Sequence, residues 1–310
     1  MSTVDESEFP APVWSHDEPR IAGATDVGVV RTVNQDAFGR FDDAERGEIL
    51  LVVADGLGGH RGGEVASQMA VELLGRGVFE GQDDPASRLR AAIQHANEEI
   101  YRASLDDTSL DGMGTTVVCL LLAEEGPSHV AHVGDSRLYR LRAGRIGSLT
   151  EDHSLVATLV REGVLSEEAA RDDPRRNQIL LALGVRPDTE IDVAPVELAP
   201  GDIYLLCSDG LHGMLDDATI LTLARRATRP DDVVRKLIAA ANDAGGTDNV
   251  TVVLAQLPDP MPVDPLPVDK LRALATRWLD STRALLSGAK EPERDSDRTD
   301  ADAQRDDSER

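Results

Sequence analysis

Several short β-branched runs in this chain end in an aspartate that stands beside glycine or a small polar residue. The runs occupy residues 49–54, 129–133 and 202–207, and they lead into Asp55-Gly56, Gly134-Asp135 and Ser208-Asp209-Gly210. Runs of this kind bounded by turn residues are typical of buried strands. Aspartates carried to one place by distant strands make a hard, oxygen-rich site of the type that Mg²⁺ or Mn²⁺ prefers. The pattern therefore predicts a strand-rich fold with a divalent metal site.

Two further clusters of the same type are Asn34-Gln35-Asp36 and Gly246-Thr247-Asp248-Asn249. Taken alone, each cluster is explained as well by a plain turn, because Asp-Gly is a common turn dipeptide. The glycines of residues 55–60 favour close approach of backbone to a ligand. A phosphate-binding P-loop is excluded because the Gly-Lys-Ser/Thr that it requires is missing, and the glycine spacing does not fit a dinucleotide fold.

The remaining periodicity predicts an α+β fold. Short connections at 124–128 and 134–136 favour antiparallel pairing, so we expect a central antiparallel β-sandwich flanked by helices on both faces, in α-β-β-α layers. A polar insertion at 151–188 is expected to form a flap beside the site. The expected strands are 49–54, 115–122, 129–133, 137–142, 191–198, 202–207 and 249–255, and the expected helices are 63–77, 85–104, 217–227 and 230–242.

Composition divides the chain into five segments. Residues 1–20 are acidic and are expected to be disordered, and residues 21–257 carry the periodic apolar pattern of a single domain. A proline-rich linker is expected at 258–268, an amphipathic helix at 269–288, and a disordered charged tail at 289–310.

The net charge of −25 argues against nucleic acid or an anionic membrane surface as the partner. No apolar stretch reaches the ~18 residues of a membrane span, and the N-terminus resembles no signal peptide. A cytoplasmic protein without a membrane span is expected. Cys119 and Cys207 lie in strand-like runs and are expected to be buried free thiols. No histidine has a second histidine or a cysteine at zinc spacing, so zinc is not expected.

Taken together, the motifs resemble the metal-dependent protein phosphatases, the PP2C-like serine/threonine phosphatases, in their bacterial form. The resemblance runs from about residue 21 to residue 257. The matching pieces are Arg31-Thr32-Val33-Asn34-Gln35-Asp36, Asp55–His60 with Gly62-Gly63-Glu64, Gly112-Met113-Gly114-Thr115-Thr116, Gly134-Asp135-Ser136-Arg137, Leu149-Thr150-Glu151-Asp152-His153-Ser154, Ser208-Asp209-Gly210-Leu211 and Gly245-Gly246-Thr247-Asp248-Asn249-Val250-Thr251.

The resemblance implies a site for two Mn²⁺ or Mg²⁺ ions. Asp55 would bridge the two cations, and the Gly56 carbonyl would reach the second cation directly or through water. Asp209 and Asp248 would bind the first cation, and Asp36 would hold waters of the second.

The resemblance also implies roles outside the central pair of ions. Asp135 would share a third, more weakly occupied metal site with Asp209, and Arg31 would bind the substrate phosphate. Animal members carry a histidine two residues after the bridging aspartate as the proposed general acid. Leu57 stands there in this chain. Either His60 or a metal-bound water would then protonate the leaving oxygen.

The implied activity is hydrolysis of phosphoserine and phosphothreonine in proteins, reversing the action of a bacterial Ser/Thr protein kinase. A monomer is expected. One alternative is a phosphatase dedicated to an anti-sigma-factor antagonist. A second is an inactive module that binds phosphoproteins, although such a module would usually have lost Asp209 or Asp248.

Overall fold

The computed structural model describes residues 14–17, 20–58, 62–81, 83–225 and 229–258. All of them belong to one compact unit, Met1–Pro260. A second unit, Met261–Arg310, lies outside the described residues. The linker expected at 258–268 (apart from residue 258), the helix expected at 269–288 and the tail expected at 289–310 therefore lie outside them too.

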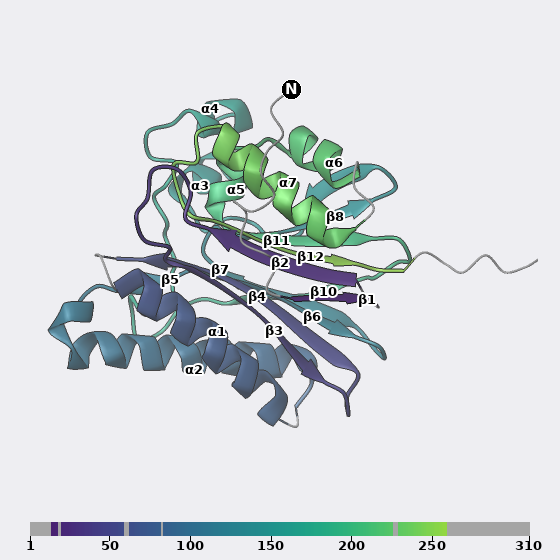
Figure 1. The fold of residues 1–310 in the computed structure, drawn as a ribbon. Coiled ribbons are helices and arrows are strands. Elements are labelled where there is room, and N and C mark those ends of the chain that lie inside the picture. The colour runs from purple at the N-terminus through teal and green to yellow at the C-terminus, as the bar shows by residue number, and fades with distance from the viewer. Residues whose placement is uncertain (1–13, 18–19, 59–61, 82, 226–228, 259–310) are drawn as a thin grey trace, which may run out of the picture. The chain divides into compact units, whose positions relative to one another are not determined.

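The described residues form two antiparallel sheets (Figure 1). The first sheet has the order β1 (Trp14–Asp17), β2 (Arg20–Asp26), β12 (Val250–Gln256), β11 (Ile203–Cys207), β8 (Arg137–Arg142) and β9 (Arg145–Ser148). The second has the order β10 (Asp192–Val196), β7 (Ser128–Val133), β6 (Val117–Ala123), β4 (Glu48–Leu57) and β3 (Asp36–Asp43), and the two-residue strand β5 (Gly114–Thr115) pairs with β4.

Helices cover the outer face of each sheet (Figure 1). The second sheet is covered by α1 (Gly62–Glu80) and α2 (Pro85–Asp106), and the first by α5 (Asp209–His212), α6 (Asp217–Arg225) and α7 (Pro230–Asp243). A 3₁₀ turn, Thr108–Leu110, follows α2. The expected flap contains α3 (Leu155–Arg161) and α4 (Glu167–Arg171). The α+β sandwich with helices on both faces is confirmed.

The apolar side chains divide into three clusters that match these layers. In β6, Val118 and Leu120 point into the cluster between the sheets, whereas Cys119 and Leu121 point toward α1 and α2. Alternate residues of a strand face opposite sides of the sheet. Because both faces of this sandwich are covered, its central strands are continuous apolar runs.

Two strands beside the site, β2 and β3, were not predicted from the sequence. Gly23 in β2 faces the ring of Phe38 in β3, and a Cβ at this glycine would lie 2.8 Å from the ring. Glycine and polar residues weaken the strand signal, but here the glycine is required by close packing between the sheets. A further correction concerns the N-terminus: β1 lies within the segment 1–20 that was expected to be disordered, so that expectation is wrong for Trp14–Asp17.

Both cysteines are buried free thiols, as expected. Burial raises the pKa of the Cys119 thiol to about 12. Among the described residues, no helix combines the length and the apolar character needed to cross a membrane.

Candidate metal centre

Five aspartates from separate segments meet at one end of the sandwich. Asp36 at the start of β3 is the direct cross-strand partner of Asp55 near the end of β4. The pKa of Asp55 is raised well above its usual range, first by burial and then by the negative charges of the other four aspartates, which are Asp36, Asp209, Asp135 and Asp248. Mutual repulsion of this kind requires the carboxylates to be close neighbours. The structure thus brings together all five aspartates that the sequence singled out.

Each aspartate is delivered by the end of a strand or by the loop next to it. Asp209 is the first residue of α5, two positions after β11 ends. Asp248 lies two positions before β12, and Asp135 lies in the loop between β7 and β8. Since β11 and β12 pair in the first sheet while β3 and β4 pair in the second, the site forms where the two sheets meet.

Asp36 is held across the two sheets by a pair of hydroxyl groups. Ser208 Oγ and Thr251 Oγ1, both from the first sheet and its connections, each donate a hydrogen bond of 2.7 Å to Asp36 Oδ2. The Thr251 backbone N–H in turn donates to Ser208 Oγ at 3.0 Å. Asp36 therefore has one oxygen fixed and the other oriented toward the site. Sequence reasoning missed this clamp, although both hydroxyls lie inside the recognised motifs.

Three of the carboxylates keep a buried oxygen that makes no hydrogen bond: Asp36 Oδ1, Asp135 Oδ1 and Asp209 Oδ1. Burying a charged oxygen without a partner costs free energy, so we expect each of these oxygens to bind a cation. Burial followed by repulsion from neighbouring aspartates raises the pKa of Asp36 to about 7, of Asp135 to about 8 and of Asp209 to about 6. Carboxylate oxygens in such a set fit Mg²⁺ or Mn²⁺ and do not fit a soft metal.

Gly56 has no room for a side chain. A Cβ there would lie 2.1 Å from the Gly63 carbonyl oxygen and 2.6 Å from that of Gln35. The Gly56 N–H donates to the Gln35 carbonyl at 3.1 Å, so the backbone here is fixed between α1 and the loop before β3. A glycine is therefore needed for the backbone beside Asp55 to pack this closely.

Arg31 lies at the exposed side of the carboxylates. Its Nη2 donates to Asp248 Oδ2 at 2.7 Å, and half of its side chain is exposed. Asn249 fixes the loop that carries it, because Asn249 Nδ2 donates to the carbonyls of Val27 and Val33. The Asn249 side chain thus anchors the Arg31 loop, and the Asn249 backbone N–H donates to Asp248 Oδ1 at 2.9 Å.

His60, the candidate general acid, lies outside the described residues, so its role stays a prediction. Leu57 ends β4 and offers no proton.

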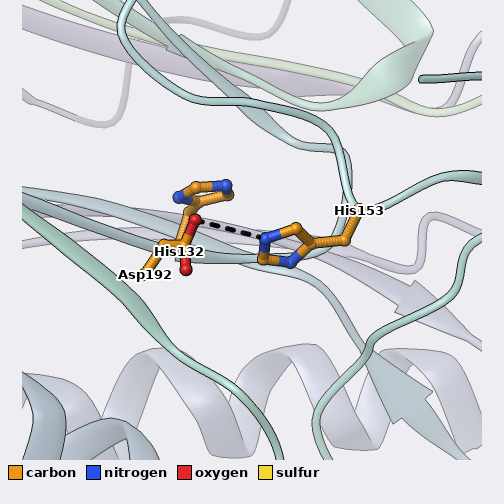
Figure 2. Close-up of side chains that lie close together, drawn as sticks. All are labelled: His132, His153 and Asp192. Atoms are coloured by element: carbon orange, nitrogen blue, oxygen red, sulfur yellow. Dashed lines mark ion pairs between the residues drawn. The ribbon is translucent and has the colours of Figure 1, made fainter. Parts of the chain in front are cut away.

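A second polar cluster, His132, His153 and Asp192, lies at the base of the flap (Figure 2). His132 and Asp192 are cross-strand partners of β7 and β10, and the rings of His132 and His153 stack with their centroids 4.6 Å apart. The contact between these histidines could not be predicted from the sequence, because His153 reaches β7 only through the folding of the segment 151–188.

The hydrogen bonds of this cluster define its protonation. The Gly134 N–H donates to His153 Nδ1, so the proton of the neutral ring is on Nε2, which lies 3.5 Å from Asp192 Oδ2. His132 Nε2 donates to the Glu151 carbonyl at 2.8 Å. A metal at His153 Nε2 would require the ring proton to move to Nδ1, which would break the hydrogen bond that Nδ1 accepts from the Gly134 N–H. The cluster is better described as an anchor that holds the start of the flap to the second sheet.

A second anchor lies nearby. Arg137 binds Asp152 through two parallel hydrogen bonds, Nε to Oδ1 at 2.8 Å and Nη2 to Oδ2 at 2.7 Å. This pair holds the pKa of Asp152 below its usual range despite the opposing effect of burial. His212, three positions after Asp209 on α5, donates through Nε2 to the Asp135 carbonyl at 3.0 Å, because a carbonyl oxygen can only accept. Burial lowers the pKa of His212 and keeps its ring neutral. The flap base is therefore fixed next to the residues that flank the metal centre.

We expect His153→Ala to loosen the flap without unfolding the domain. The variant loses the acceptor for the Gly134 N–H and the ring that stacks on His132. Amide hydrogen exchange in α3 should accelerate about fivefold, the equivalent of one lost hydrogen bond of about 1 kcal/mol, while exchange in α7 stays unchanged. His95→Ala, an exposed change on α2, is the matched control. Unchanged exchange in α3 would show that the cluster does not anchor the flap.

Comparison with known proteins agrees with this geometry. A family model described as "Protein phosphatase 2C" matches residues 29–250. The chain is 40% identical over 237 residues to the serine/threonine phosphatase stp of Listeria innocua serovar 6a, covering 75% of this chain and 93% of that protein.

Solved structures show the same similarity. The serine/threonine phosphatase PstP/Ppp of Mycobacterium tuberculosis superposes with a TM-score of 0.68 at 37% identity, covering 77% of this chain and 98% of that one. A structure of the catalytic domain of PstP in complex with two manganese ions has a TM-score of 0.66 at 35% identity, with coverage of 77% and 98%.

Proposed function

The chain belongs to the protein phosphatase 2C family and is a protein-serine/threonine phosphatase, and from this premise we propose how its own residues carry out the hydrolysis. Two divalent cations, Mn²⁺ or Mg²⁺, are held by Asp55, Asp209, Asp248 and Asp36, with the Gly56 carbonyl as a further oxygen donor. The observation that carries this proposal is the set of buried, unpartnered carboxylate oxygens at one point of the sandwich.

The five aspartates have different roles in this proposal. Asp55, which feels the negative charge of the other four aspartates, would face both cations. Asp209 and Asp248 would bind one cation, and Asp36, which accepts hydrogen bonds from Ser208 and Thr251, would hold the waters of the other. Asp135 would serve a third, weaker position together with Asp209. When bound, such a pair of cations lowers the pKa of a bridging water and neutralises charge on the phosphoryl oxygens.

Arg31 is the residue of the chain that would receive the substrate phosphate. Its guanidinium is half exposed and is paired with Asp248. Its planar fork can donate two hydrogen bonds at once to phosphate oxygens. On substrate binding, the Arg31 guanidinium would exchange its hydrogen bond to Asp248 for hydrogen bonds to the phosphate, and Asp248 would serve as a cation ligand. The leaving oxygen must receive a proton, and His60 or water remain the two candidates.

Phosphorylated proteins are the substrates implied by this activity, and a bacterial Ser/Thr kinase would supply them. The curated relative from Listeria innocua carries the name serine/threonine phosphatase, which supports this substrate class. The kinase itself, the monomeric state and the cytoplasmic location are proposals that rest on the sequence.

The test is hydrolysis of a phosphothreonine peptide in the presence of Mn²⁺, in the presence of EDTA, and by Asp209→Ala. We expect EDTA to reduce turnover to background and Asp209→Ala to lose about a thousandfold, because a ligand of the cation that stabilises transition-state charge is gone. Asp83→Ala, which removes an exposed carboxylate before α2, is the control and should retain full turnover. Turnover that persists in EDTA, or full activity of Asp209→Ala, contradicts the proposed mechanism.

A further inference from the structure

We propose that the loop of residues 28–33 forms a binding subsite for an aliphatic side chain of the substrate, next to its phosphorylated residue. The inference rests on the proposed function of the metal centre and deepens it by naming a substrate class: phosphoproteins with leucine, isoleucine, valine or methionine within two positions of the phosphoserine or phosphothreonine.

Three valines of this loop are exposed on either side of the phosphate-binding arginine. Val29 is 67% exposed, Val30 63% and Val33 40%. They stand two and one positions before Arg31 and two positions after it. Single exposed apolar side chains are ordinary on protein surfaces, but a group of them beside a site marks a binding surface. Outside this loop, the exposed large apolar side chains in the described part of the chain are Leu105, Val164, Leu180 and Val185, and none of them is next to a proposed site residue in the sequence.

The loop is fixed by hydrogen bonds, so the exposure of the valines is built into the fold. The N–H groups of Val29 and Val30 donate to the Gly246 carbonyl at 2.8 and 3.2 Å. Asn249 Nδ2 donates to the carbonyls of Val27 and Val33. The turn of residues 245–249, which carries Asp248, therefore holds both ends of the loop.

Gly28 shows how closely the loop packs on that turn. It has a φ of +81°, and a Cβ there would lie 2.2 Å from the Asp248 carbonyl oxygen. Its N–H donates to Asp26 Oδ1 at 2.8 Å. A loop fixed in this way cannot turn its valines inward. It presents a preorganised apolar surface, for which little conformational entropy is lost on binding.

The spacing of the valines suits a peptide whose phosphate lies on Arg31. An extended peptide advances about 3.3–3.6 Å per residue, so side chains one or two positions from the phosphoresidue lie within about 7 Å of it along the chain. Val29, Val30 and Val33 lie within two positions of Arg31 along the loop. We therefore expect aliphatic neighbours of the phosphoresidue to reach them while the phosphate stays on the guanidinium.

Charge disfavours acidic neighbours of the phosphorylated residue. The chain has a net charge of −25, and Asp248, which accepts a hydrogen bond from Arg31 of this loop, is one of five clustered aspartates. Acidic residues that flank the phosphorylated residue are repelled by this field, and Arg31 is already committed to the phosphate. An aliphatic neighbour carries no such penalty and removes apolar surface of the valines from water.

The test compares two phosphothreonine peptides that differ only in having leucine or serine on both sides of the phosphothreonine. For the unaltered enzyme we expect kcat/KM to be about tenfold higher for the leucine peptide, mainly through KM, because one or two aliphatic groups enter an open apolar surface. In Val29→Ser/Val30→Ser/Val33→Ser the ratio should fall to about 1. Leu105→Ser, an equally exposed change on α2, should keep the ratio of the unaltered enzyme.

Because both peptides are measured on the same protein, any general loss of activity cancels in the ratio, and the single change Val30→Ser provides a milder second variant. If the unaltered enzyme turns over both peptides equally well, the subsite proposal is wrong, but the proposed metal centre is unaffected. The same conclusion follows if the preference for the leucine peptide persists in the triple variant. Absence of manganese-dependent turnover of either peptide, and of p-nitrophenyl phosphate, overturns the proposed function and the subsite with it.

Discussion

Asp55→Asn is expected to lower turnover of a phosphothreonine peptide by about a thousandfold or more, the loss of several kcal/mol of transition-state stabilisation. Asp55 is the carboxylate on which the charges of the other four aspartates converge. Asparagine has the same shape as aspartate but offers a single neutral oxygen. It therefore cannot present an anionic oxygen to each of two cations. The measurement is steady-state kinetics with Mn²⁺, accompanied by calorimetric titration of Mn²⁺ into the metal-free protein.

Asp135→Asn is the matched comparison for Asp55→Asn. Both residues are buried aspartates of the same site, but the proposal assigns Asp135 only to the weaker third position. Turnover of Asp135→Asn should fall by only about tenfold, the lower end of the range seen when a supporting interaction of a metal site is lost, and the two central cations should still bind. Equal losses of turnover in the two variants would contradict the different roles proposed for Asp55 and Asp135. So would an Asp55→Asn enzyme that kept more than a tenth of the turnover of the unaltered enzyme.

The clearest strand signals in the sequence belong to strands that are covered on both faces. β6 and β11 have apolar residues at every position from Val117 to Leu122 and from Ile203 to Cys207, and a continuous apolar run of this length is readable without tertiary information. β2 and β3 are different because they depend on a contact between sheets. Gly23 makes room for Phe38, and no local pattern reports that the two residues will be neighbours.

The metal centre shows a similar division. The aspartates could be named from the sequence because each motif keeps its glycine or small polar neighbours and because the motifs occur in a recognisable order. The clamp on Asp36 could not be named, since Ser208 and Thr251 become neighbours of Asp36 only when the two sheets pack. The stacked pair of His132 and His153 was hidden for the same reason. Contacts between distant segments carry no periodic signal of their own.

The metal-free protein is expected to become less stable as pH rises from about 6.5 to 8. Burial and mutual repulsion raise the pKa of Asp36 to about 7 and of Asp135 to about 8, whereas both groups titrate near 3.9 in the unfolded chain. In this window the folded state therefore binds more protons than the unfolded state. Stability falls with pH under that condition, by about 1.4 kcal/mol per pH unit for each extra proton held. Thermal melting in EDTA across this pH range is the measurement.

The window is chosen so that groups outside the metal centre contribute little. Burial lowers the pKa of His132 and His212, so the unfolded chain takes up protons at these residues as pH falls through about 6.5, and their small opposing effect on stability is nearly complete by about pH 7.5. Aspartates with a lowered pKa, such as Asp152 and Asp231, make their full contribution above about pH 4. The buried thiol of Cys119 begins to matter only above about 8.5.

Saturating Mn²⁺ should abolish or reverse the fall, because the cations bind the ionised carboxylates and compete with protons more successfully as pH rises. Asp36→Asn should reduce the slope in EDTA, since it removes one of the clustered carboxyl groups that hold a proton in this window. Asp83→Asn, an exposed change that leaves the site intact, should keep it. A melting temperature in EDTA that stays constant or rises between about pH 6.5 and 8 would show that the carboxylates are ionised without a metal. The clustered aspartates would then have to be stabilised by the protein alone.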